Sequence, residues 1–184
     1  MHKISVTAMA SLGLLGLTTS TALADKNIFT ETFNILPAPC EGLQLAGATY
    51  SFTVAGVPNL DCEAGTFVGP GHTNHIQAPN IEGTAAGVLH LTFDVPTTHF
   101  DFGVAESTLR SPQSVVVDLN RPGVGMLRQE VDLITTNDPL FVGAGFVYDG
   151  PAVKTVAISF PVGGGFARFA VDNVSYFRPP GQTK

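Results

Sequence analysis

The chain has 184 residues, of which 44% are hydrophobic and 13% charged, and its formal net charge at pH 7 is −6. This length suits one domain with a sizeable core. The acidic balance argues against a protein that binds nucleic acid or anionic membranes, because both partners require a positive surface. It is compatible with a cation, a basic surface or a neutral glycan as the partner.

The first 24 residues have the parts of a secretory signal peptide. A short cationic start (His2, Lys3) precedes the apolar run ISVTAMASLGLLGL, and Ala22-Leu23-Ala24 forms the small-x-small pattern that signal peptidase cleaves. The apolar run is too short to span a bilayer comfortably, so a membrane anchor is the weaker interpretation. We therefore expect a secreted or periplasmic protein with no membrane insertion after cleavage.

Residues 25–178 are predicted to form a single β-sandwich domain, and residues 179–184 a loose tail. Short runs rich in Val, Phe, Thr and Ile alternate with Gly- and Pro-rich breakers, which is typical of all-β sandwiches and barrels. No segment of ten or more residues keeps a helical period. Residues 55–86 are expected to form a long loop. The predicted strands are 28–34, 47–54, 87–95, 99–105, 114–119, 128–134, 140–148, 153–160 and 166–177.

Alternation within the strands indicates which side chains face the core. In the run 88–95 the apolar set is Leu89, Leu91, Phe93 and Val95, while the opposite parity is mostly polar. In the next run the apolar set is Phe100, Phe102 and Val104. Such half-buried strands are the kind that antiparallel sheets prefer.

The two cysteines of the chain, Cys40 and Cys62, both follow the cleavage site. An even pair in an exported protein predicts a disulfide. Closing a loop of this length stabilises a fold by about 3 kcal/mol in the chain-entropy model. The alternative, two free thiols that bind a metal, has neither a C-x-x-C motif nor a His pair at zinc spacing in its favour.

The last predicted strand changes its apolar phase. Val171 and Val174 belong to opposite parities, so the phase switches across Asp172-Asn173. One extra residue in a strand produces this switch, and the pattern therefore predicts a β-bulge. A bulge would aim Asp172 either inward or toward a neighbouring strand end.

The first predicted strand also carries an acid on its apolar face, because Glu31 shares a parity with Phe29 and Phe33. A buried carboxylate is costly unless it is paired or bound to a cation. Arg168 is the nearest basic residue to Asp172 in the sequence and is a candidate partner for one of the two acids.

The segments LTFDVPTTHFDFGVA and VAISFPVGGGFARFAVDNVSYF resemble secreted bacterial jelly-roll domains related to galactose-binding domains and carbohydrate-binding modules. Such domains occur in exported proteins with a C-terminal PEP-type (PEP-CTERM) sorting signal. The resemblance covers residues 28–34 and 87–177, and it implies an all-β, antiparallel jelly-roll β-sandwich of eight or nine strands. This chain departs from the pattern because it has no sorting tail before Lys184, so we expect a free exported protein.

The same resemblance implies a structural Ca²⁺, since jelly rolls of this kind often hold calcium near one sheet edge with ligands from the first and last strands. Carried over to this sequence, the ligands are Glu31 and Asp172, with Asn173 as a further candidate. Ca²⁺ takes about six to eight oxygens, so backbone carbonyls and waters would complete the set. The alternative is a structural Asp172 that hydrogen-bonds a turn.

A second candidate metal site is the loop sequence GPGHTNH, which contains His72 and His75. Together with Asp61 or Glu63 these residues suggest zinc or copper binding. The alternative is an ordinary polar loop, because no third ligand is set by spacing.

Catalytic motifs are missing from the sequence. It contains no G-x-S-x-G, and its Gly-rich turns lack the Lys-Ser/Thr of a P-loop. Glu130 and Asp132 share a strand face, which is more typical of a solvated sheet surface than of a pair of catalytic carboxylates. With no Trp and three Tyr, an aromatic platform for crystalline polysaccharide is disfavoured, whereas a shallow polar site remains open.

The leading hypothesis is an exported, non-catalytic domain that binds a glycan or another surface ligand, with Ca²⁺ as a candidate structural ion. One alternative is a structural or matrix protein without a small ligand. The other is a polysaccharide hydrolase or lyase that uses Glu130, Asp132 and the loop histidines. The sequence leaves the oligomeric state undetermined.

Overall fold

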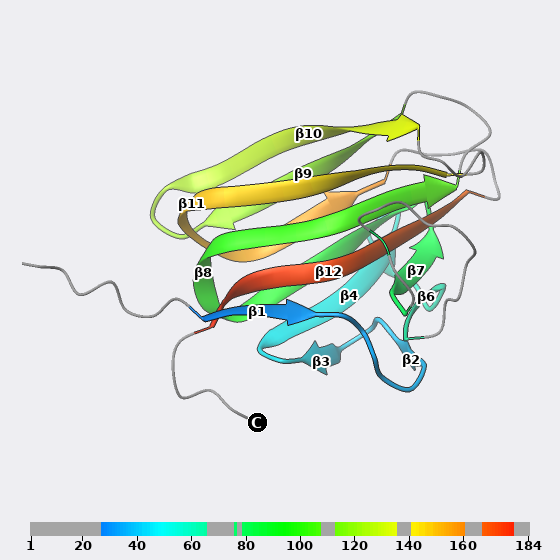
Figure 1. The fold of residues 1–184 in the computed structure, drawn as a ribbon, viewed down its shortest axis with the longest axis horizontal. Helices are drawn as coiled ribbons and strands as arrows, with labels where there is room; N and C mark the ends of the chain where they lie inside the picture. Colours follow the sequence, from blue (N-terminus) through cyan, green and yellow to red (C-terminus); the bar gives the residue numbers. More distant parts are fainter. Residues whose placement is uncertain are drawn as a thin grey trace, which may run out of the picture.

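The computed structural model describes residues 27–65, 76, 79–107, 113–135, 141–160 and 167–178. The signal peptide predicted at 1–24, the loop histidines His72 and His75 and the tail at 179–184 lie outside the described residues. All regular elements within them are β-strands (Figure 1). Across the same ranges, no helix has the length and hydrophobicity needed to cross a bilayer.

The described residues form twelve strands, where eight or nine were expected. Two long strands, β8 (Gly87–Ser107) and β11 (Phe141–Ser159), each join two predicted strands, and several short strands occupy segments expected to be loops. The others are β1 (Asn27–Glu31), β2 (Ala38–Pro39), β3 (Leu43–Leu45), β4 (Ala48–Val54), β5 (Val57–Pro58), β6 (Cys62–Ala64), β7 (Ile81–Thr84), β9 (Gln113–Arg121), β10 (Gly125–Thr135) and β12 (Arg168–Arg178).

The strands form two layers that share β8 and β11 (Figure 1). The front layer contains residues 141–149 of β11, residues 99–107 of β8, and β12, followed by β7 and β1. The back layer contains β4, residues 87–93 of β8, residues 155–159 of β11, β9 and β10. Every pairing is antiparallel, so the all-β antiparallel prediction is confirmed.

Both long strands bend where they pass from one layer to the other. The β8–β11 register shifts between Asp149 and Thr155, on either side of Val153. Near the bend in β8, the hydroxyl of Thr97 donates to the carbonyl oxygen of His99 (2.6 Å) and accepts from the backbone N–H of Phe177 (3.0 Å). Val95, predicted to face the core, is 37% exposed because it lies at this bend.

Aromatic side chains fill the space between the layers. Phe93 of the back layer lies 5.4 Å from Phe100 and 5.0 Å from Tyr176, measured between ring centroids, and Phe52 lies 5.4 Å from Phe169. Each fully buried Phe contributes roughly 1.5–3 kcal/mol relative to an exposed one. The alternation predicted for 88–95 and 99–105 is therefore confirmed apart from Val95.

The disulfide between Cys40 and Cys62 is formed, with the two Cα atoms 5.4 Å apart. The backbone N–H of Cys40 also donates to the carbonyl oxygen of Cys62 at 2.9 Å. Both cysteines are buried, and β2 pairs with β6 directly beside them. The disulfide thus ties the chain after β1 to the outer strand of the β12–β7–β6 series.

Glu106 is an acid that the sequence reasoning missed. It lies on the core-facing parity of β8 and has no exposed surface, and neither carboxyl oxygen has a hydrogen-bond partner among the described residues. Burial raises its pKa from 4.5 to about 8. Glu106 therefore keeps its proton at neutral pH in the folded protein, whereas the unfolded chain releases it.

This difference predicts a pH-dependent stability. Since the folded pKa is the higher one, the free energy of unfolding should fall as the pH rises from about 4.5 to about 8. Glu106→Gln cannot ionise, so it should remove this slope and exceed the wild type in stability at pH 7 by on the order of 3 kcal/mol.

Urea unfolding at several pH values measures this effect. Glu41→Gln, a substitution at an exposed position, is the matched control and should reproduce the wild-type profile. Parallel profiles for the wild type and Glu106→Gln would contradict a buried, protonated Glu106.

Candidate functional site

The outer face of the front layer carries a row of residues from β8 and β11 that point away from the core. Three pairs of residues on β8 and β11 face outward there, as register partners: His99↔Asp149, Asp101↔Val147 and Gly103↔Gly145. Their neighbours of opposite parity, including Phe100, Phe102 and Phe146, face the core. The two facing glycines leave the sheet backbone without side chains at this point.

A groove of about 400 Å³ lies over these glycines. It is lined by Asp101, Phe102, Gly103, Gly145, Phe146, Val147 and Asn173. The side chain of Val147 is 66% exposed and supplies an apolar wall, while Asp101 and Asn173 supply polar groups. A volume of this order is typical of pockets for small ligands.

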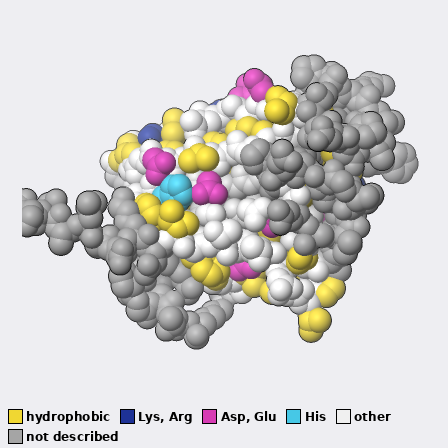
Figure 2. All heavy atoms as spheres, viewed as in Figure 1, with side chains coloured by type: hydrophobic (Ala, Val, Ile, Leu, Met, Phe, Trp, Pro, Cys, Tyr) yellow, Lys and Arg dark blue, Asp and Glu magenta, His cyan; other side chains and the backbone are white. Residues whose placement is uncertain are grey.

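His99 stands at one end of the groove between two carboxylates. Its Nε2 atom is 2.8 Å from Oδ2 of Asp101, and its Nδ1 atom is 2.8 Å from Oδ1 of Asp149. The ring also lies against Phe177, with centroids 5.0 Å apart. Figure 2 shows a histidine on this face with acidic side chains on either side and hydrophobic side chains around them.

Burial lowers the pKa of His99, but the hydrogen bonds to Asp149 and Asp101 and the charges of both carboxylates outweigh it, so the net pKa is raised. This cluster was not predicted from the sequence, because His99 and Asp149 are 50 residues apart. Only the β8–β11 register brings them together.

The predicted β-bulge is confirmed at the edge of the groove. The β12–β8 register shifts between Asp172 and Ser175, and Asn173 has a φ of 52°. Asn tolerates this left-handed conformation better than most residues. The amide of Asn173 donates to Oδ2 of Asp172 (3.1 Å), and the bulge brings Asn173 into the groove lining.

The residues predicted to bind Ca²⁺ lie where β12 changes its partner strand. β7 pairs with β12 as far as Ile81↔Val171, and β1 takes over at Glu31↔Val174, so the predicted neighbourhood of the first and last strands is confirmed. Asp172 and Asn173 occupy the interval between the ends of β7 and β1. Asn80 directly precedes β7, so extending the β7–β12 register by one residue beyond Ile81↔Val171 brings it opposite Asp172.

The two carboxylates leave β12 and β1 on opposite faces. Glu31 shares the core-side face with Val174, whereas Asp172 pairs with Gly103 of the outer face. Glu31 also accepts a hydrogen bond from the backbone N–H of Phe33 (3.0 Å). Burial raises its pKa, and the backbone hydrogen bonds of Phe33 and Thr32 oppose that rise.

Asn80 adds an observation that bears on a cation. Its side chain has no exposed surface, and neither amide atom has a hydrogen-bond partner in the described part of the chain. Carboxylate, amide and backbone oxygens around the interval are the ligand types that Ca²⁺ prefers. Asp172, Asn173 and Asn80 offer such oxygens at the interval between β7 and β1, whereas Glu31 leaves β1 on the other face, and the calcium site stays a prediction.

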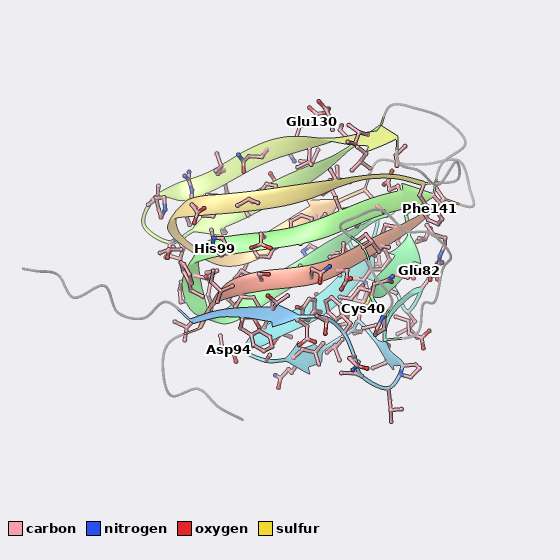
Figure 3. All side chains as sticks on the ribbon, in the orientation of Figure 1. Cys40, Glu82, Asp94, His99, Glu130 and Phe141 are labelled. Carbon is pink, nitrogen blue, oxygen red and sulfur yellow. A yellow bond between two sulfur atoms is a disulfide. The ribbon has the colours of Figure 1, made fainter. Side chains whose placement is uncertain are left out.

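Arg168, the suggested partner of Glu31 or Asp172, pairs with other acids instead. Its Nε atom is 2.7 Å from Oε1 of Glu82, and its NH1 atom is 2.7 Å from Oδ1 of Asp61. Figure 3 shows Glu82 and His99 toward opposite ends of the front layer. Asp61, a suggested co-ligand of the loop histidines, is thus engaged by Arg168.

The acids suggested for hydrolytic chemistry lie away from the groove. Glu130 and Asp132 are on β10, next to the back-layer strand β9, where Glu130 accepts a hydrogen bond from Ser114. Within the described ranges, no group of three or more His, Cys, Asp or Glu side chains is arranged to hold a metal.

Several solved structures are similar to this chain. The K1 cleaved adhesin domain of Lys-gingipain from Porphyromonas gingivalis W83 is 12% identical, with a TM-score of 0.54 over 82% of this chain and 97% of that domain. The K2 cleaved adhesin domain of Lys-gingipain is 16% identical, with a TM-score of 0.51 over 83% and 98%. TmCBM61, solved in complex with β-1,4-galactotriose, is 12% identical, with a TM-score of 0.43 over 71% and 88%.

No protein-family model and no curated protein matches the sequence. At these identities the two adhesin domains show the fold alone. Together with the strand pairing they establish that the chain is an all-β, antiparallel β-sandwich, consistent with a jelly roll.

Proposed function

We propose that this protein is an exported, non-catalytic β-sandwich domain that binds a glycan in the groove between β8, β11 and β12. The observation that carries the proposal is the groove of about 400 Å³, open over the facing pair Gly103 and Gly145 and bordered by Asp101 and Asn173. A carboxylate and an amide suit the many hydroxyl groups of a sugar, because they accept and donate hydrogen bonds.

The shape of the groove supports a single sugar chain over a crystalline surface. Val147 offers an exposed apolar side chain for the C–H groups of a sugar ring, and the glycine floor lets a flat ring approach the backbone. The rings of Phe102 and Phe146 face the core, so they form no exposed stacking platform. The ligand class is therefore a soluble or loosely held glycan chain.

Two further features support the proposal that the protein is exported and binds a ligand outside the cytoplasm. The disulfide Cys40–Cys62 suits an oxidising compartment, as does the predicted signal peptide. The similar domains of Lys-gingipain are named as adhesin domains. A domain that adheres to extracellular material needs a ligand site on its surface, as the proposed glycan-binding domain does.

A glycan array followed by isothermal titration calorimetry tests the proposal. Gly145→Phe places a ring on the groove floor at an exposed strand position, so we expect at least a tenfold weaker affinity, about 1.4 kcal/mol, without a change in melting temperature. Val124→Phe is the control, because Val124 is exposed in the β9–β10 turn, outside the groove lining.

Other outcomes discriminate the alternatives. If no glycan on the array binds, a matrix role without a small ligand replaces the proposal. Release of reducing sugars by the purified protein would instead indicate a hydrolase, and new unsaturated ends a lyase. Equal weakening by Gly145→Phe and Val124→Phe would place the ligand elsewhere.

We also propose a structural Ca²⁺ in the interval between β7 and β1, with oxygens from Asp172, Asn173 and Asn80. Glu31, also predicted as a ligand, leaves β1 on the other face and is not included. The orphaned amide of Asn80 supports it, since a buried amide without a partner is costly unless something binds it. The ion would stabilise the place where β12 exchanges one neighbouring strand for another.

Thermal melting in EDTA and then in excess calcium tests the ion. A ligand that binds only the native state adds about 2.7 kcal/mol at a hundred times its Kd, so the melting temperature should rise with calcium. Asp172→Asn should abolish the rise, while Asp132→Asn, at an exposed position of β10, should preserve it. A wild-type melting temperature that is identical in EDTA and in calcium would eliminate the ion.

A further inference from the structure

Building on the proposed glycan site, we propose that Asp101, held by a protonated His99, makes the groove selective for uncharged sugars over acidic ones. The inference names both the ligand class and the residue that sets it.

The described charged side chains that line the groove or lie at its His99 end, apart from His99 itself, are acidic. Among the described residues that line it, Asp101 is the one ionisable side chain, and none of them is Lys or Arg. The side chain of Asp101 is 30% exposed, and that of Asp149, at the same end, is 70% exposed. A uronic acid or sulfated sugar would bring a like charge beside these carboxylates, and repulsion at contact distance is only partly screened by salt.

The hydrogen bonds of His99 define its role. Both ring nitrogens are 2.8 Å from carboxylate oxygens, and carboxylates accept but do not donate. Only the doubly protonated imidazolium donates from both nitrogens. His99 therefore has no ring N–H left for a ligand, and it is a positioning residue for Asp101.

Asp101 keeps an acceptor available for the ligand. His99 engages Oδ2, and no hydrogen bond within the described residues engages Oδ1. A sugar hydroxyl that donates to this oxygen would make a charge-assisted hydrogen bond, which is shorter and stronger than a neutral one. The imidazolium fixes the carboxylate in advance, so less rotational freedom is lost when a sugar binds.

The proton on His99 makes affinity depend on pH. Among the described residues, three strands supply side chains against the His99 ring. Two of these side chains are titratable, Asp101 on β8 and Asp149 on β11, and the third is Phe177 on β12. Because the hydrogen bonds and charges of the carboxylates raise the pKa of His99 despite its burial, the proton is lost only as the pH rises through that raised value. One hydrogen bond then disappears and the cluster becomes more negative, so glycan affinity should fall with rising pH.

The test uses matched ligand pairs. Cellohexaose, mannohexaose and xylohexaose, together with a galactohexaose, represent neutral glycans, and each hexose oligomer is compared with the same oligomer oxidised at C6 to the uronic acid. For the hexose oligomer that binds most tightly, we expect at least tenfold weaker binding after oxidation. Asp101→Asn should reduce this ratio toward one, while Asp118→Asn, at the Arg128 ion pair of the back layer, should leave it unchanged.

The pH profile tests the positioning role. Wild-type affinity for the neutral oligomer should decline as the pH rises, and His99→Gln should flatten the decline. Asp149→Asn should move its midpoint to lower pH, since it removes one of the two carboxylates that hold the proton. An effect on folding alone would leave the midpoint in place.

The outcomes separate the inference from the proposed function. Three results would overturn the inference and leave the glycan site standing. They are equal affinity for the neutral and the oxidised oligomer, an unchanged ratio of these two affinities in Asp101→Asn, and an unchanged pH midpoint in Asp149→Asn. If neither the neutral nor the oxidised oligomers bind, both the glycan site and the inference fail.

Discussion

The structure depends on the continuous antiparallel pairing of β8 with β11. The two strands stay paired from Phe141↔Ser107 to Ser159↔Val88, through a bend, and so supply central strands to both layers. Because side chains alternate along a strand, the register of this pairing in each layer decides which residues reach the core and which reach solvent. The aromatic contacts between Phe93, Phe100 and Tyr176 then close the layers on each other.

The groove is a by-product of the same register. Gly103 meets Gly145 across the front layer, Asp101 meets Val147, and His99 meets Asp149. A slip of one residue by either strand would turn that strand's three members of the row toward the core and bring its phenylalanines to the surface, which the burial of those rings opposes strongly. Hydrophobic packing on the core side therefore fixes the positions of the groove residues on the outer face. The bulge in β12 adds Asn173 to the groove lining.

Local patterns predicted much of this architecture. Alternation located the core faces of 88–95 and 99–105, the phase change located the bulge at Asp172-Asn173, and the cysteine pair located the disulfide. Pro96 and Gly150-Pro151 read as strand breakers, yet pairing continues around both, so the long strands were missed. The pairing of His99 with Asp149 and the partners of Arg168 arise from contacts between distant segments, which no local pattern encodes. Glu106 continues the core-facing parity of Phe100, Phe102 and Val104, so the alternation itself carried its signal.

The pairing of β1 with β12 joins the two ends of the described chain, and Thr30 and Ser175 hydrogen-bond across 145 residues of sequence. Contacts of such high sequence separation slow folding, since a long loop must close before they form. A nascent chain that does not yet include β12 lacks both the neighbour of β1 and one border of the groove. The front layer is thus completed only after synthesis has passed the final strand, and a prematurely terminated product would expose Phe29 and the edge of β8 to aggregation.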